Sequence, residues 1–201
     1  MPTIEQVLVV PRDDLLCGKP IPNGFACEGL PDLIKNIYAH AYFIDRPKAE
    51  TDSELKQIIP YVVVTGKSGK IFSLKRKTAQ TEKRLHNKSS IGVGGHINPD
   101  GNAEKNISGI IERSLERELH EELSVKCPYK YTLIGYLNDD SNDVGSVHFG
   151  LVYRLEVADE SKVEVNEKDL MQGEFLEMKT VEANYPAMET WSQLVFKAIK
   201  N

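Results

Sequence analysis

Hydrophobic residues recur along the chain in two kinds of pattern. Short runs rich in β-branched and aromatic residues, bounded by glycine, proline or polar clusters, are typical of β-strands. The runs that we predict as strands cover residues 6–10, 42–44, 59–65, 70–75, 90–97, 131–137, 147–157 and 174–178. The segment Gly66-Lys67-Ser68-Gly69 lies between two of these runs and predicts a hairpin turn.

Apolar residues at helical spacing predict three helices, over 31–38, 107–123 and 187–200. The helix over 107–123 has the clearest pattern, and Asn106 and Ser108 are both suitable N-caps for it. Its apolar residues fall four apart: Ile107, Ile111, Leu115, Leu119 and Leu123. A helix within a run of strands, and another after it, predicts an α+β fold in which a mixed β-sheet is sandwiched between helices.

The first part of the chain differs from the rest. Residues 1–58 contain a loop with Gly18, Pro20, Pro22 and Gly24 and too few apolar residues to fold alone. We therefore interpret residues 1–58 as an N-terminal arm that packs on a domain spanning residues 59–201.

Composition excludes several classes of protein. The chain has 201 residues, of which 40% are hydrophobic, so it can form a buried core. With 25 Lys and Arg against 30 Asp and Glu, the net charge of -5 does not favour a nucleic acid partner. Cys17, Cys27 and Cys127 form an odd set without metal-ligand spacing, so a disulfide framework and a cysteine zinc site are not expected. No membrane helix or signal peptide is predicted, which favours a cytoplasmic protein.

Three acidic residues gather near the end of the helix predicted over 107–123. On a helical wheel, Glu118, Glu121 and Glu122 share an arc of roughly 100°, and Glu122 projects from the apolar sector. Arg117 can reach Glu121 at i,i+4, but one cation does not balance three anions. Clustered carboxylates are typical ligands of hard cations such as Mg²⁺ or Mn²⁺. A solvated acidic helix face is the alternative, since Glu112 also lies in the apolar sector.

These residues, together with two glycines, resemble the signature of the Nudix hydrolases. That family carries glycine, five residues, glutamate, seven residues and then Arg-Glu-aliphatic-x-Glu-Glu-x-Gly-aliphatic. The second half matches at Arg117, Glu118, Leu119, Glu121, Glu122 and Val125, and Gly94 and Gly95 resemble the opening glycines. The resemblance implies a Nudix-type domain over 59–201 and a metal site formed by Gly94, Gly95, Glu118, Glu121 and Glu122. In that site Arg117 would hold the acids in register.

The chain departs from the family pattern in three ways. The stretch between Gly95 and Arg117 is longer than in the family, and residues 98–104 resemble an insertion. The upstream signature glutamate would fall at Gly109, with Glu104 as a substitute. Ser124 replaces the glycine that ends the signature helix, and we expect this to cost from a few tenths to about 1 kcal/mol through left-handed strain.

Other residues are candidates for supporting roles. The resemblance implies a further carboxylate before the last helix, for which Glu174 is the candidate and the acidic loop 139–143 the rival. Lys75, Arg76 and Arg84 precede the glycine strand and could bind substrate phosphates. For each of them an exposed structural role is the alternative.

The resemblance implies a Nudix-type pyrophosphohydrolase that uses Mg²⁺ or Mn²⁺. Such an enzyme cleaves a nucleoside diphosphate linked to another moiety, a small-molecule phosphoanhydride, by attack of water at phosphorus. One alternative is a non-catalytic Nudix module that senses a nucleotide ligand, although such modules commonly lose the acids retained here. Another is an enzyme similar to isopentenyl diphosphate isomerase, but Gly94 and Gly95 stand where a cysteine would be needed.

The resemblance also bears on oligomeric state. The apolar run over 6–10 must be buried somewhere, and an N-terminal strand can pair with the sheet edge of its own domain or of a partner subunit. We expect a homodimer in which residues 1–58 contribute to the interface or to the active site. A monomer whose arm covers its own sheet is the alternative.

Overall fold

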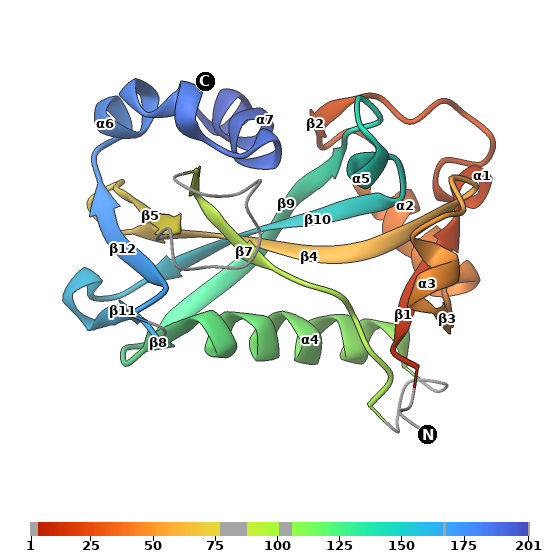
Figure 1. Ribbon diagram of the computed structural model, residues 1–201, viewed down its shortest axis with the longest axis horizontal. Helices are drawn as coiled ribbons and strands as arrows, with labels where there is room; N and C mark the ends of the chain where they lie inside the picture. The colour runs from red at the N-terminus through yellow and green to blue at the C-terminus, as the bar shows by residue number, and fades with distance from the viewer. Residues whose placement is uncertain (1–3, 77–87, 101–105, 167, 201) are drawn as a thin grey trace. The chain divides into compact units, whose positions relative to one another are not determined.

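A computed structural model of the protein describes residues 4–76, 88–100, 106–166 and 168–200 (Figure 1). The chain forms two compact units. The first comprises Met1–Pro60, Gly95–Glu116 and Ile134–Val152, and the second comprises Tyr61–Gly94, Arg117–Leu133 and Tyr153–Asn201. Each unit contains helices and strands, so the predicted α+β class is confirmed. The boundary between an arm over 1–58 and a domain over 59–201 stays a prediction.

The elements of the first unit come largely from the N-terminal part of the chain. They are β1 (Gln6–Pro11), α1 (Arg12–Leu15), β2 (Gly24–Ala26), α2 (Leu30–His40), β3 (Tyr42–Asp45), α3 (Arg46–Ala49) and α5 (Asp143–Ser146). Four elements have residues in both units: β4 (Leu55–Gly66), α4 (Ile107–Glu122), β9 (Tyr129–Asn138) and β10 (His148–Val157).

In the first unit, β1 is a central strand. It pairs antiparallel with β3, where Val7 lies opposite Ile44, and with the start of β4, where Val9 lies opposite Gln57. Residues 7–10 are fully buried, because this strand is apolar on both faces. The predicted strand over 6–10 is therefore confirmed, and its burial takes place within its own chain.

The second unit holds the remaining elements. They are β5 (Ile71–Arg76), β6 (Ser89–Ser90), β7 (Gly92–Gly94), β8 (Leu123–Val125), η3 (Glu160–Lys162), β11 (Val163–Val165), β12 (Met171–Leu176), α6 (Met178–Ala183), η4 (Tyr185–Ala187) and α7 (Thr190–Ile199). Antiparallel pairs place β5 between β4 and β12, and β7 pairs with β4. In Figure 1, α6 and α7 lie side by side along this unit.

The hairpin between β4 and β5 forms as predicted. Thr65 lies opposite Ile71, and Gly69 adopts φ +85°, a conformation that favours glycine. The predicted strand over 90–97 is instead divided into β6 and β7. The Ser90 hydroxyl lies 2.8 Å from the Gly92 carbonyl oxygen and 3.1 Å from its amide nitrogen, and such local bonds compete with strand pairing.

The signature helix α4 begins at Ile107 with Asn106 as its cap. The Asn106 side chain accepts a hydrogen bond from the Gly109 amide at 2.9 Å, which selects Asn106 over Ser108. The apolar positions from Ile111 to Leu123 are buried as their spacing predicts: Ile111, Leu115, Leu119 and Leu123.

The expectation that Ser124 has a strained, left-handed backbone is wrong. Helix α4 ends at Glu122 and continues directly into β8, in which Ser124 lies opposite Glu164 of β11. Among the described non-glycine residues, only Cys17 has a positive φ, so Ser124 is not left-handed. Asn166 satisfies the last helical carbonyls: its side chain donates to His120 and Glu121, and its amide donates to Glu122. A glycine is therefore unnecessary at this helix end.

Candidate active site

The acidic end of α4 is organised by one arginine. The Arg117 guanidinium lies 2.7 Å from a Glu118 carboxylate oxygen and 3.1 Å from a Glu121 oxygen. The Glu118 side chain is only 13% exposed, whereas the Glu121 side chain is 57% exposed. One guanidinium thus pairs with two carboxylates of different burial, as the i,i+4 spacing predicted for Glu121.

Glu122 of α4 acts electrostatically on Tyr61 of β4. Burial is the main cause that raises the pKa of the Tyr61 phenol to about 12, and the negative charges of Glu189 and Glu122 raise it further. Gly94 lies directly opposite Tyr61 in the pairing of β7 with β4. Tyr61 therefore pairs with Gly94 in the sheet and is influenced by the charges of Glu122 and Glu189, all within the second unit.

A hydroxyl network fixes Tyr61 in this position. Its hydroxyl lies 2.8 Å from Ser192 Oγ, and Ser192 Oγ accepts the Ile91 amide at 3.0 Å. The ring packs edge-on against Trp191 with centroids 5.7 Å apart. A Cβ at Gly92 would lie 2.1 Å from the Tyr61 ring, so this glycine is required by close packing. The start of α7 is thereby attached to β4 and β7.

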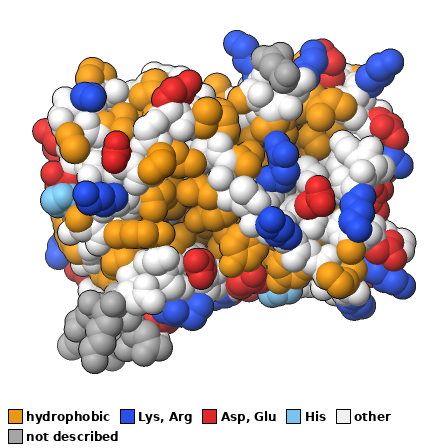
Figure 2. Space-filling view, turned by 180° about the vertical axis from the view of Figure 1, so that it is seen from behind, with side chains coloured by type: hydrophobic (Ala, Val, Ile, Leu, Met, Phe, Trp, Pro, Cys, Tyr) orange, Lys and Arg blue, Asp and Glu red, His pale blue; other side chains and the backbone are white. Residues whose placement is uncertain are grey.

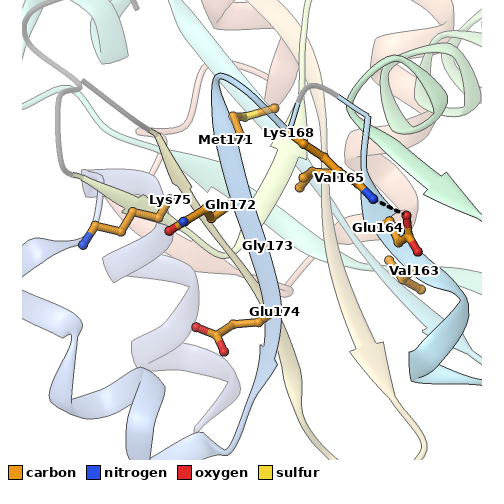
Figure 3. Close-up of a pocket in the computed structure, with 9 residues that line it drawn as sticks. All are labelled: Lys75, Val163, Glu164, Val165, Lys168, Met171, Gln172, Gly173 and Glu174. Carbon is orange, nitrogen blue, oxygen red and sulfur yellow. Dashed lines mark hydrogen bonds and ion pairs between the residues drawn. The ribbon is translucent and has the colours of Figure 1, made fainter. Parts of the chain in front are cut away.

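Glu174 and Lys75 line a pocket of about 540 Å³ in the second unit (Figure 3). Lys75 on β5 lies opposite Gln172 on β12, and alternation along β12 places Gln172 and Glu174 on the same face. Figure 3 shows these three side chains directed to one side of the strands. Glu118, Glu121 and Glu122 are absent from the residues that line this pocket.

Three of the predicted site residues, Arg76, Arg84 and Glu104, lie wholly or partly outside the described part of the chain. Arg84 and Glu104 lie outside the described residues, and Arg76 is described only by its backbone on β5. Gly95 belongs to the first unit, whereas Gly94 and the three signature acids belong to the second.

The acidic loop that was a rival metal site has a structural role. In the first unit, Asp140 accepts two hydrogen bonds from Arg12 at 2.9 Å and one from Lys56 at 2.8 Å. Asn138 donates to the other carboxylate oxygen at 2.9 Å. The Arg12 hydrogen bond is the main cause that holds the pKa of Asp140 well below its usual range. This carboxylate is saturated by protein donors.

The donors at the end of α4 suit a hard divalent cation. They are carboxylates with one neighbouring guanidinium, which is the ligand chemistry that Mg²⁺ and Mn²⁺ prefer. Their oxygen atoms are not all within 4.8 Å of one another, so among the described residues they do not form a closed ligand group. The residues fit the metal by chemistry, and the metal site stays a prediction.

Sequence reasoning missed Glu189 and Asn166. Glu189 precedes α7, and its charge acts on Tyr61 of β4, more than 100 positions earlier in the chain, so no local pattern identifies it. Asn166 follows β11 and caps a helix more than 40 positions earlier, as its separation of 46 residues from His120 shows. Both depend on contacts between segments distant in sequence.

Comparisons with known proteins support the resemblance. No family model matches the chain. Protein YmaB of Bacillus subtilis (strain 168) is 34% identical over 198 residues, which cover 95% of each chain. The crystal structure of Tm1382, a candidate Nudix hydrolase, superposes with a TM-score of 0.81 at 28% identity, covering 97% of this chain and 98% of Tm1382. This chain belongs to the Nudix hydrolase family.

A more distant structure shares the Nudix-type fold of this protein. DR0079 from Deinococcus radiodurans superposes with a TM-score of 0.52 at 18% identity, covering 78% of this chain and 90% of DR0079. The predicted fold class and family are thus confirmed for this Nudix protein. Within the described residues, no helix combines the length and apolar character needed to cross a membrane.

Proposed function

We propose that this Nudix protein is a metal-dependent pyrophosphohydrolase acting on a nucleoside diphosphate linked to another moiety. The observation that carries the proposal is the acidic end of α4. There Arg117 pairs with Glu118 and Glu121, while the charge of Glu122 acts on Tyr61. Three carboxylates thus accompany one guanidinium. Such an excess of negative charge is expected where a divalent cation binds and carries a phosphate substrate.

In this proposal, Glu118, Glu121 and Glu122 hold Mg²⁺ or Mn²⁺ together with the backbone carbonyl of Gly94, which belongs to the same unit. When bound, the metal would neutralise negative charge on the phosphate and lower the pKa of a coordinated water molecule. Arg117 keeps Glu118 and Glu121 in fixed orientations through its two ion pairs. Lys75, with Arg76 and Arg84, would bind the remaining phosphate charge.

Glu189 is our proposed additional carboxylate, in place of Glu174. Its charge acts on the same phenol as that of Glu122, and it immediately precedes α7, which the network of Tyr61 and Ser192 attaches to β4. Such a position suits a residue that orients or deprotonates the attacking water. Glu174, in contrast, lines the pocket beside Lys75.

The assembly that we propose is a cytoplasmic homodimer. Figure 2 shows hydrophobic side chains gathered on one face of the molecule. The exposed large hydrophobic residues of the described chain all belong to the first unit: Ile4, Tyr38, Tyr42 and Val144. Surfaces of this kind commonly form subunit contacts. Light scattering would give a mass near 22.6 kDa if the protein were instead a monomer.

Product release from a panel of nucleoside diphosphate derivatives tests the proposed activity. The full chain should hydrolyse at least one compound when Mg²⁺ or Mn²⁺ is present and none when a chelator is added. Glu122→Gln should lower turnover by about 100-fold or more, which corresponds to about 2.7 kcal/mol of transition-state stabilisation. Glu112→Gln, an exposed change on the same helix, is the matched control. Equal turnover by Glu122→Gln and wild type would exclude the proposed role.

A further inference from the structure

A second group of potential metal ligands lies in the first unit. Glu50 follows α3, His96 follows β7, and His148 is the first residue of β10. One carboxylate oxygen and one nitrogen from each ring all lie within 4.8 Å of one another. In the described part of the chain, this is the one such group of three His, Cys, Asp or Glu side chains.

The tautomer of His148 is fixed by its surroundings. Its Nδ1 lies 2.6 Å from the Val144 carbonyl oxygen, which can only accept a hydrogen bond. In the neutral ring the proton is therefore on Nδ1, and Nε2 carries a lone pair. A backbone carbonyl that orients the remote ring nitrogen is a common arrangement for a metal-binding histidine.

The two imidazoles have a spacing that suits a shared metal ion. His148 Nε2 lies 3.2 Å from His96 Nε2. Zinc–nitrogen distances of about 2.0–2.1 Å in a tetrahedral site place two ligand nitrogens about 3.3 Å apart. Without a metal, the Nε2–H of His96 would donate a hydrogen bond to Nε2 of His148. Zinc binding therefore requires only that the proton of His96 moves to its Nδ1, which frees the Nε2 lone pair. His148 is buried and Glu50 is exposed, which leaves one side of the group open to solvent.

The charges around the rings are mixed. Arg46 forms ion pairs with Glu5 at 2.9 Å and with Glu50 at 3.1 Å. Burial, aided by Arg46, lowers the pKa of His96 to about 4, and burial also lowers the pKa of His148, with Lys56 and Arg46 contributing. In both rings burial favours the neutral form, which is the form that binds metal.

We propose that Glu50, His96 and His148 bind one Zn²⁺ ion. Two imidazoles and a carboxylate suit zinc better than Mg²⁺, which prefers an all-oxygen set. This inference goes beyond the proposed hydrolase activity and does not depend on it. The ion would join three segments of the first unit that are 46 and 52 positions apart, as their residue numbers show, and would stabilise that unit.

Zinc titration of the chelator-treated full chain tests the proposal. With excess Mg²⁺ present, we expect about one equivalent of Zn²⁺ to bind with a Kd at or below about 1 μM. The thermal midpoint should rise with Zn²⁺, because a ligand that binds only the folded state stabilises it. When Co²⁺ replaces Zn²⁺, we expect visible absorption bands of the bound cobalt but no charge-transfer band from a thiolate. The lack of that band would show that none of the three cysteines is a ligand.

Variants identify the ligands. His96→Gln should weaken Zn²⁺ binding by about 100-fold, and Glu50→Gln by about tenfold, since each removes one ligand. His120→Gln, which changes an exposed histidine of α4, should bind Zn²⁺ as the wild type does. Circular dichroism would verify that each variant is folded. Binding of less than half an equivalent by the full chain, or unchanged affinity in folded His96→Gln, would overturn the proposal.

Discussion

The two units each contain a cluster of charged side chains, and the clusters are balanced in opposite ways. In the first unit, Asp140 is one carboxylate facing two cations, Arg12 and the fully buried Lys56. In the second unit, Arg117 is one cation facing Glu118 and Glu121. A buried charge must be compensated by the protein itself, whereas partly exposed acids can remain in excess. The comparison separates a cluster that stabilises the fold from one that is available to a ligand.

The largest expected effect comes from removing the charge of the first cluster. Asp140→Asn should lower the free energy of unfolding by about 3–5 kcal/mol, because it leaves Lys56 buried without its counterion. Urea denaturation measures this change. Asp143→Asn, in an exposed position of the same loop, should lie within about 0.5 kcal/mol of wild type. If both variants had the stability of wild type, the first cluster would have no structural role.

The second prediction identifies the additional acid of the α4 cluster. Glu189→Gln should reduce turnover by about 100-fold or more, the lower end of the typical contribution of a general acid or base, whereas Glu174→Gln should have a smaller effect. Steady-state rates on the compound found in the panel provide the measurement. A larger loss for Glu174→Gln would instead place the pocket beside Lys75 at the reacting bond.

The pH dependence of stability should also distinguish the clusters. The pKa of Asp140 is lowered in the folded state, so the unfolded state takes up its proton first as the pH falls. The stability from Asp140 is therefore complete above about pH 5 and is lost progressively below it, with a slope of at most about 1.4 kcal/mol per pH unit. Denaturation curves of wild type and Asp140→Asn should converge in acid. A constant difference between them at every pH would contradict this origin.

A smaller effect is expected at the junction of α4 and β8. Ser124→Gly should destabilise the protein by about 0.5–1 kcal/mol, because glycine is unfavourable within a strand. Thermal denaturation would detect the change, with Ser161→Gly in η3 as a comparison outside the junction. Stabilisation by Ser124→Gly would restore the interpretation that serine is strained at this helix end.

The smallest expected effect concerns the stability of the acidic helix end. Glu122→Gln should leave the free energy of unfolding unchanged or raise it by a few tenths of a kcal/mol, because it removes repulsion between neighbouring acids. Paired with its predicted loss of turnover, this result would show that the acid serves function rather than folding. A stability loss similar to that of Asp140→Asn would make the two clusters alike.

Periodicity predicted the long elements of the fold well. The stripe from Ile111 to Leu123 identified α4, because its apolar residues recur at helical spacing. The continuous apolar run around Val7 identified β1, which is buried on both faces. The short elements α1, α3, β8 and β11 were missed, since three or four residues carry no measurable period. The strand over 90–97 was overextended because the bonds from the Ser90 side chain to Gly92 are not visible in a hydrophobicity pattern.

The local part of the candidate site was also predictable, whereas its tertiary part was not. The Arg117–Glu121 ion pair follows from a spacing of four residues along one helix. The effect of the Glu189 charge on Tyr61 depends instead on how α7 packs against β4. The expected strain at Ser124 failed because the family pattern assumes a helix end with a left-handed residue, while here the chain enters β8 and Asn166 caps the helix.

The direct passage from α4 into β8 also constrains how this protein can be engineered. Foreign sequence inserted between Glu122 and Leu123 would separate the helix from the strand pairing and from the Asn166 cap. The turn at Lys67 and Ser68 is exposed and joins two paired strands, which makes it suitable for a tag, a fluorophore or new termini in a circular permutant. Libraries that vary substrate preference should therefore hold residues 117–125 constant and place length changes elsewhere.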